Sequence, residues 1–179
     1  LIIAFIALLV VFWKRLDKEP VAKLKKDGFM LSLPMMGKLI LYKECAVFAR
    51  TLGALLGAGI PLIRALRVSR EVVGNTVLAT HLVQVEEDVR GGTGLGASLE
   101  KTNQFPALLH QLVAVGEESG RTANILIKSA ATFDTTVRHQ ISGLVAALQP
   151  ALIIILAIAV GGITITMLSA VFSMNAVDF

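Results

Sequence analysis

The feature of this 179-residue sequence that most limits its possible folds is a long run without ionisable side chains near its end. Residues 140–177 contain no Asp, Glu, Lys, Arg or His, and residues 150–172 are predominantly apolar. A helix needs about 20 apolar residues, each rising about 1.5 Å, to cross the hydrocarbon core of a bilayer. The sequence therefore predicts a transmembrane helix over residues 150–172.

A second uncharged run opens the sequence. Residues 1–12 are apolar, but they are too few to span a bilayer, and the sequence does not begin with Met. We therefore expect residues 1–13 to be the C-terminal part of a transmembrane helix. A signal peptide is the alternative, but its basic residues would precede the apolar run, whereas Lys14 and Arg15 follow it.

The distribution of basic residues predicts the orientation in the membrane. All 17 Lys and Arg residues lie from Lys14 to Arg138, between the two apolar runs. Lys and Arg in short segments beside membrane helices stay in the cytoplasm. We therefore expect residues 14–38 to form a basic cytoplasmic linker, residues 39–149 a cytoplasmic domain, and residues 173–179 a periplasmic tail.

The net charge of +4 is explained by this topology. Aromatic side chains are not interleaved with the basic residues, as they often are on nucleic-acid-binding surfaces. Hydrophobic residues make up 55% of the chain and charged residues 17%, compared with about 45–50% and about 25% in soluble domains. The composition thus predicts a lipid bilayer, and no nucleic acid, as a partner.

Residues 39–149 have helical periodicity, and no alternating apolar pattern bounded by turn residues indicates a strand. Gly and Pro residues separate the predicted helices. A short helix is expected over residues 21–26 of the linker. The helices predicted after it cover residues 39–56, 61–72, 76–90, 97–101, 105–118 and the sequence from 121 onward.

The fold class predicted is all-α: a membrane protein with a cytoplasmic antiparallel bundle of about six helices, flanked by transmembrane helices. Between Gly120 and Pro150 the only residue that disfavours a helix is Gly143. The last helix of the domain is therefore expected to continue into the membrane helix as one rod, bent at Pro150, where one backbone hydrogen bond is lost.

Motifs for catalysis and cofactor binding are missing. The sequence has no GxxxxGK[ST] nucleotide-binding loop, and the glycines between Gly91 and Gly96 follow no buried strand, so a turn is expected there. The three histidines, His81, His110 and His139, are too far apart in sequence to predict a metal site. Cys45 has no cysteine partner and is expected to be a packed, reduced thiol. We predict no catalytic residue, no cofactor and no enzyme activity.

Three arginines form a candidate contact surface. Arg64, Arg67 and Arg70 recur every three residues on a predicted helix, so they form a basic stripe suited to an acidic partner. The alternative is an ordinary solvated helix face.

Two adjacent carboxylates, Glu117 and Glu118, end another predicted helix just before a Ser-Gly turn. This position is unfavourable for anions, because the C-terminal end of the helix dipole prefers cations. One alternative is structural, with the carboxylates pairing with Arg121 or capping the following helix. A partner contact is another, and Ca²⁺ or Mg²⁺ binding with oxygen ligands from elsewhere is the third.

The sequence resembles the type II secretion system protein F domain over about residues 39–172. The matching elements occur in the order and spacing of that family. They are Phe48-Ala49-Arg50-Thr51-Leu52, Leu55-Leu56, Gly59-Ile60-Pro61-Leu62, Gly74-Asn75, Phe105-Pro106, Val115-Gly116-Glu117-Glu118-Ser119-Gly120 and Leu148-Gln149-Pro150.

The resemblance implies a multi-pass platform protein of the bacterial inner membrane, in a type II secretion or type IV pilus machine. Family members carry two such cytoplasmic domains and three membrane helices, and this sequence resembles the C-terminal half. The implied role is non-enzymatic: coupling a cytoplasmic ATPase to the assembly of pilin-like subunits into a pseudopilus or pilus. The implied partners are that ATPase, pilin-like subunits, other inner-membrane platform proteins and further copies of the chain.

A small oligomeric transporter or channel subunit is the alternative function. Transporters typically carry charges or broken helices in the middle of the membrane, and residues 150–172 carry no charge. A membrane-anchored enzyme would need a group of convergent titratable residues, which the sequence does not indicate.

Overall fold

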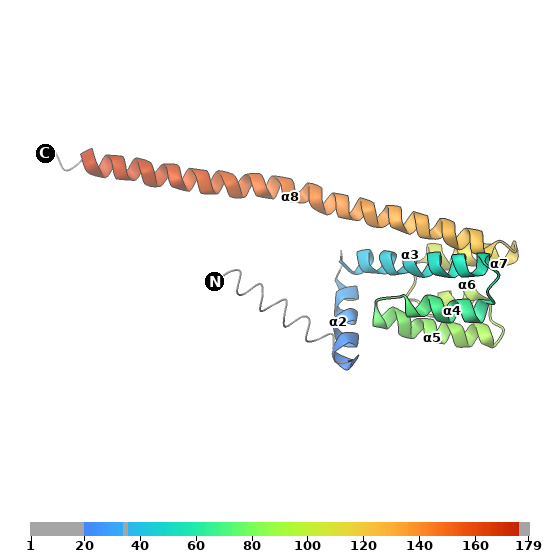
Figure 1. The fold of residues 1–179 in the computed structure, drawn as a ribbon. Coiled ribbons are helices and arrows are strands. Elements are labelled where there is room, and N and C mark those ends of the chain that lie inside the picture. Colours follow the sequence, from blue (N-terminus) through green and yellow to red (C-terminus); the bar gives the residue numbers. More distant parts are fainter. Residues whose placement is uncertain (1–19, 34–35, 176–179) are drawn as a thin grey trace. The chain divides into compact units, whose positions relative to one another are not determined.

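The computed structural model describes residues 20–33 and 36–175, and the regular elements within them are all helices. The all-α prediction is therefore confirmed. The expectations for residues 1–13, for Lys14 and Arg15, and for the end of the tail at residues 176–179 lie outside the described residues. The helices are α2 (Pro20–Ser32), α3 (Met36–Gly57), α4 (Leu62–Glu71), α5 (Thr76–Arg90), α6 (Leu95–Lys101), α7 (Ala107–Glu118) and α8 (Thr122–Asn175) (Figure 1).

Most helix boundaries agree with the sequence pattern, and the largest difference is at α2. α5 begins and ends where periodicity predicted, at Thr76 and Arg90. In the segment expected to be a linker with a short helix, α2 runs from Pro20 to Ser32. α2 packs against α3 and α5, so contacts distant in sequence stabilise a helix that its own pattern indicates weakly.

The chain divides into two compact units, with the boundary between Val137 and Arg138. The first unit has one hydrophobic core, built from α3 to α7 and the beginning of α8. Two pairs of stacked rings contribute: Tyr42 with Phe133, and Phe48 with Phe105. Its largest fully buried side chains are Phe48, Phe133, Leu52, Leu66, Leu78, Leu82, Leu95, Leu99, Leu109, Leu126, Val85 and Val113.

Close contacts between helices of the first unit depend on two glycines. A Cβ atom added to Gly53 of α3 would lie 2.9 Å from the carbonyl oxygen of Ala123 in α8. A Cβ added to Gly96 of α6 would lie 2.8 Å from the Cβ and the backbone nitrogen of Ala114 in α7. Both distances are far below van der Waals contact, so only glycine permits these approaches.

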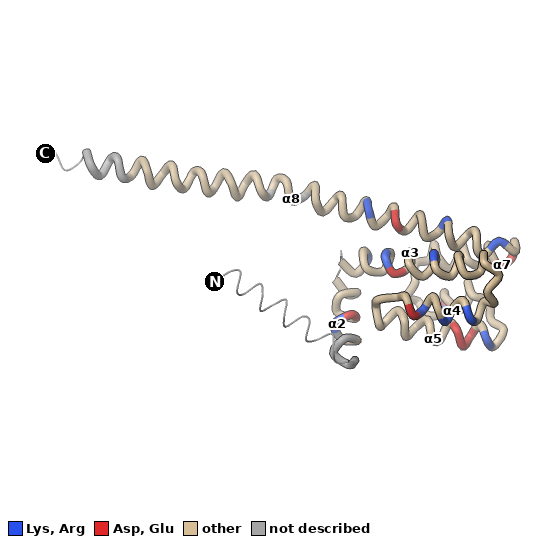
Figure 2. Tube along the Cα trace, in the orientation of Figure 1, with Lys and Arg blue, Asp and Glu red and all other residues tan. Residues whose placement is uncertain are grey.

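The second unit consists of the rest of α8. A single helix covers Thr122–Asn175 with Pro150 inside it, which agrees with the predicted continuity of the last domain helix and the apolar segment. Within the described part of the chain, α8 is the one helix long and apolar enough to cross a membrane, by length and composition. Figure 2 shows that the charged residues on α8 precede this apolar stretch.

Candidate partner-contact site

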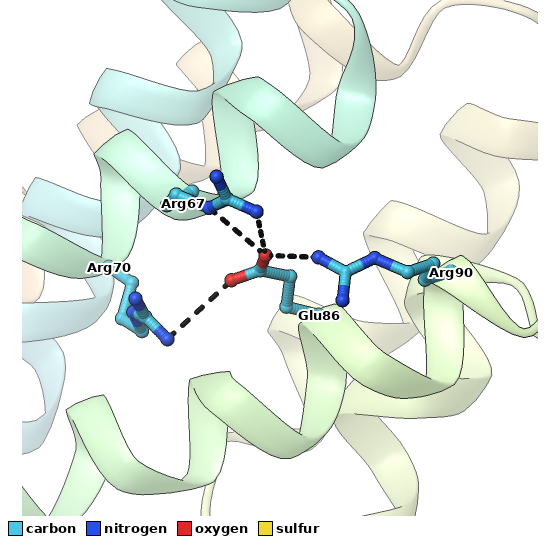
Figure 3. A network of polar contacts seen from close by, with 4 residues as sticks. All are labelled: Arg67, Arg70, Glu86 and Arg90. Atoms are coloured by element: carbon cyan, nitrogen blue, oxygen red, sulfur yellow. Dashed lines mark hydrogen bonds and ion pairs between the residues drawn. The ribbon is translucent and has the colours of Figure 1, made fainter.

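Three arginines surround the carboxylate of Glu86 at the packed interface of α4 and α5 (Figure 3). Arg67 donates through Nε and Nη2 to Oε1 of Glu86, at 3.3 and 3.1 Å. Arg90, one turn further along α5, donates through Nη2 to the same oxygen at 2.7 Å. Nη1 of Arg70 lies 3.5 Å from Oε2. We call Arg67, Arg70 and Arg90 the arginine cluster.

Burial differs strongly between the carboxylate and the cations. The Glu86 side chain is 8% exposed, whereas the side chains of Arg67 and Arg90 are 55% and 54% exposed. A buried carboxylate needs cationic partners to offset its loss of hydration. Because three guanidinium groups share one carboxylate, the cluster carries excess positive charge, and most of it lies at the surface.

All three arginines of the predicted basic stripe lie on α4, and two of them contact Glu86. Arg67 and Arg70 converge on Glu86, whereas Arg64 is exposed and makes no ion pair among the described residues. Sequence reasoning missed Glu86 and Arg90. Their spacing of four residues on one helix is the signal that could have found them, because such pairs lie on the same helix face.

The structural role of Glu117 differs from the two structural alternatives predicted for it, which were pairing with Arg121 and capping the following helix. Its Oε1 accepts a hydrogen bond from the backbone nitrogen of Leu95 at 2.7 Å, and its Oε2 accepts one from Gly96 at 2.9 Å. Gly94, at the N-cap of α6, has no side chain to accept these bonds. The carboxylate therefore caps the preceding helix α6, where the positive end of the helix dipole favours an anion.

Glu118 remains a candidate contact residue, because its side chain is exposed and makes no hydrogen bond or ion pair within the described ranges. In the described part of the chain, no group of three or more His, Cys, Asp or Glu side chains is arranged to hold a metal ion. The predicted pairing of this corner with Arg121 is not seen among the described ion pairs.

Comparison with known proteins identifies the family. The family model described as "Type II secretion system (T2SS), protein F" matches residues 48–170, more than half of the chain. The chain belongs to the type II secretion system protein F family. The arginine cluster, Glu86 and Glu117 all lie inside the matched range.

Relatives of this family member occur in both secretion and pilus machines. Type II secretion system protein F of Pseudomonas aeruginosa is 33% identical over 148 residues, which cover 83% of this chain and 36% of that protein. The protein of the same name from Xanthomonas campestris is 40% identical over 124 residues, covering 69% of this chain and 31% of its own. Type IV pilus assembly protein PilC of Pseudomonas aeruginosa is 31% identical over 151 residues, covering 84% and 40%. The chain spans less than half of the length of these relatives.

In this protein F family member, two more carboxylates connect helices near the beginning of the described chain. Oδ2 of Asp27, on α2, accepts hydrogen bonds from the backbone nitrogen and the hydroxyl of Thr76, at 2.9 and 2.7 Å. Oε2 of Glu44, on α3, accepts one from the backbone nitrogen of Gly74 at 2.7 Å. Both contacts stabilise the turn between α4 and α5 and the start of α5.

The expected packed thiol is found beside Glu44. Cys45 is free and buried. Burial, together with the negative charge of Glu44, raises the pKa of the Cys45 thiol above its ordinary value. The thiol therefore stays protonated and takes part in core packing.

Proposed function

We propose that this chain acts as part of a non-enzymatic assembly platform in the bacterial inner membrane, in a type II secretion or type IV pilus-like machine. In this proposal the first unit lies in the cytoplasm and couples a secretion ATPase to the assembly of pilin-like subunits, together with other platform proteins and further copies of the chain. The family match over residues 48–170 is the observation that carries the proposal.

The exposed apolar side chains of α8 support the membrane location. Ile158, Ile163 and Ile165 lie in the uncharged run and are all exposed. A stretch of this length with no charge is favourable in hydrocarbon and unfavourable in water. The basic residues that precede it support a cytoplasmic first unit.

A complementation experiment tests the platform role. The gene is deleted in its own bacterium, and export of a secreted enzyme and assembly of pilus-like fibres are both measured. We expect the deletion to abolish at least one of them and the full-length gene to restore it. Normal export and normal fibres in the deletion strain would refute the proposal.

The alternative function, a transporter, predicts solute flux through the protein alone. The purified full-length protein is placed in liposomes, and the passage of ions and small solutes is followed without any ATPase. We expect no flux above that of empty liposomes, because the uncharged residues 150–172 offer no polar path. Solute movement under these conditions would favour the transporter.

A further inference from the structure

A groove of about 430 Å³ lies on the first unit, lined by residues of α2, α4 and α5. Most of its exposed area is apolar and comes from Leu24 of α2, Val73 after α4, and Ala79 and Val83 of α5, and the other lining residues include Thr76 and Thr80. Arg70 lines the groove and also belongs to the arginine cluster. The groove and the arginine cluster therefore form one continuous surface.

The register of α5 explains this continuity. Ala79 and Val83 line the groove, and Glu86 and Arg90 continue along the helix at the same spacing of three and four residues. Residues at this spacing share one face of a helix. A single face of α5 thus changes from apolar at the groove to charged at the arginine cluster.

The charged end of this surface is suited to carboxylates. Arg67 and Arg90 are more than half exposed, and each guanidinium carries more N–H donors than its contact with Glu86 uses. Guanidinium groups bind carboxylates through paired, charge-assisted hydrogen bonds. Glu71 also lines the groove, so the favourable position for an incoming anion is the end near Arg67 and Arg90.

The geometry points to a docking site for an acidic amphipathic segment of a partner protein, with apolar side chains in the groove and carboxylates on Arg67 and Arg90. This inference rests on the proposed function, because an assembly platform has to engage another protein. A peptide can present apolar and acidic groups in one register, as segments that bind grooves do. The combination of an apolar groove with the cluster's excess charge therefore favours a protein segment over a lipid surface.

Photo-crosslinking in living cells tests the site with the full-length protein. A photoreactive amino acid replaces Val83 in the groove, and in a control strain it replaces Val115, an exposed residue of α7. We expect Val83 to give a protein product whose crosslinked peptide, identified by mass spectrometry, is rich in Asp and Glu. Val115 should not give this product.

Charge variants then test the role of the arginines. Losing charge-assisted hydrogen bonds in Arg67→Ala with Arg90→Ala should lower the crosslink yield at Val83 about tenfold. Arg64→Ala removes the same charge from the same helix and should leave the yield unchanged. Arg67→Glu should abolish the product, and Lys in place of an acidic residue of the partner should restore it. Because the changes at Arg67 and Arg90 remove partners of buried Glu86, each of these variants is also made together with Glu86→Gln, and melting curves check that the compared variants are folded.

Four results would overturn the inference: no product at Val83, a lipid product, a crosslinked segment without acidic residues, or equal effects of Arg64→Ala and of the double variant. Export measured in the same cells separates the two proposals. Normal export without a protein crosslink at Val83 refutes the docking site and leaves the platform role in place. Normal export in the deletion strain refutes the platform role itself.

Discussion

Both units contain helices rich in apolar side chains, but these side chains are buried in the first unit and exposed in the second. In the first unit Leu52 of α3 is 0% exposed and packs inside a core. In the second unit Ile158 of α8 is 70% exposed. Charged side chains differ as well: the first unit buries Glu86 beside three arginines, whereas the second unit has no Asp, Glu, Lys or Arg between Arg138 and the end of its described part.

This difference shows what each unit needs in order to be stable. The first unit removes its apolar side chains from water by packing its own helices together, the main favourable contribution to folding. Residues 152–160 and 162–169 of the second unit are all exposed among the described residues. An apolar environment such as a bilayer is favourable for side chains exposed in this way.

The largest expected effect comes from a cavity in the first unit. Leu52→Ala should lower the free energy of unfolding by about 2–5 kcal/mol, because the lost side chain leaves a cavity in the core. Urea denaturation of the full-length protein in detergent measures it. The matched control is Leu152→Ala in the second unit, where the side chain is exposed and little change is expected. Equal losses would show that the two units do not differ as described.

A charge in the second unit tests its membrane character. Ile158→Arg should impair membrane insertion, because Arg near the centre of a lipid-facing helix costs about 2.5–3.5 kcal/mol on insertion scales. The amount of protein in washed membranes is the measurement, and Ile158→Leu is the control. Unchanged membrane yield for the Arg variant would mean that Ile158 does not face lipid.

The adjacent carboxylates Glu117 and Glu118 of the first unit test whether Glu117 stabilises the unit by capping α6. Glu117→Gln should lower the free energy of unfolding by about 1.5–3 kcal/mol, because it removes a charged acceptor from the N-terminus of α6. Glu118→Gln should leave it unchanged or raise it by about 0.3–1 kcal/mol, because an anion at a helix C-terminus is unfavourable. Thermal and urea melts of the two variants are compared. A larger loss for Glu118→Gln would contradict the capping role of Glu117.

The smallest expected effect is the loss of stability when one hydrogen-bonded polar side chain is removed from each unit. The Asn75 side chain caps α5 by accepting hydrogen bonds from the backbone of Val77 and Leu78, so Asn75→Ala should cost about 0.5–2 kcal/mol. The hydroxyl of Thr164 donates to the carbonyl of Val160 within α8. Because the backbone hydrogen bonds of α8 remain without this hydroxyl, Thr164→Ala should change stability very little. The same melts measure both. An equal loss of stability in both variants would show that the two side chains contribute equally, contrary to this prediction.

Features that depend on neighbouring residues were determined by the sequence alone. The absence of charge over residues 140–177 predicts a membrane-spanning segment because the free energy of inserting a helix depends on its own side chains. Helical periodicity located α5 at Thr76–Arg90 because the spacing of apolar residues decides which face of a helix can be buried. Gly and Pro separated the helices because their backbone preferences are local.

Features that depend on residues distant in sequence were decided only by the tertiary structure. Glu117 caps α6, although its sequence position suggested Arg121 or the following helix as partners. Glu86 is the common partner of arginines from two helices, which the pattern of either helix alone does not show. A carboxylate binds the donors that folding brings within about 3 Å of it, and packing of the whole unit determines which donors these are.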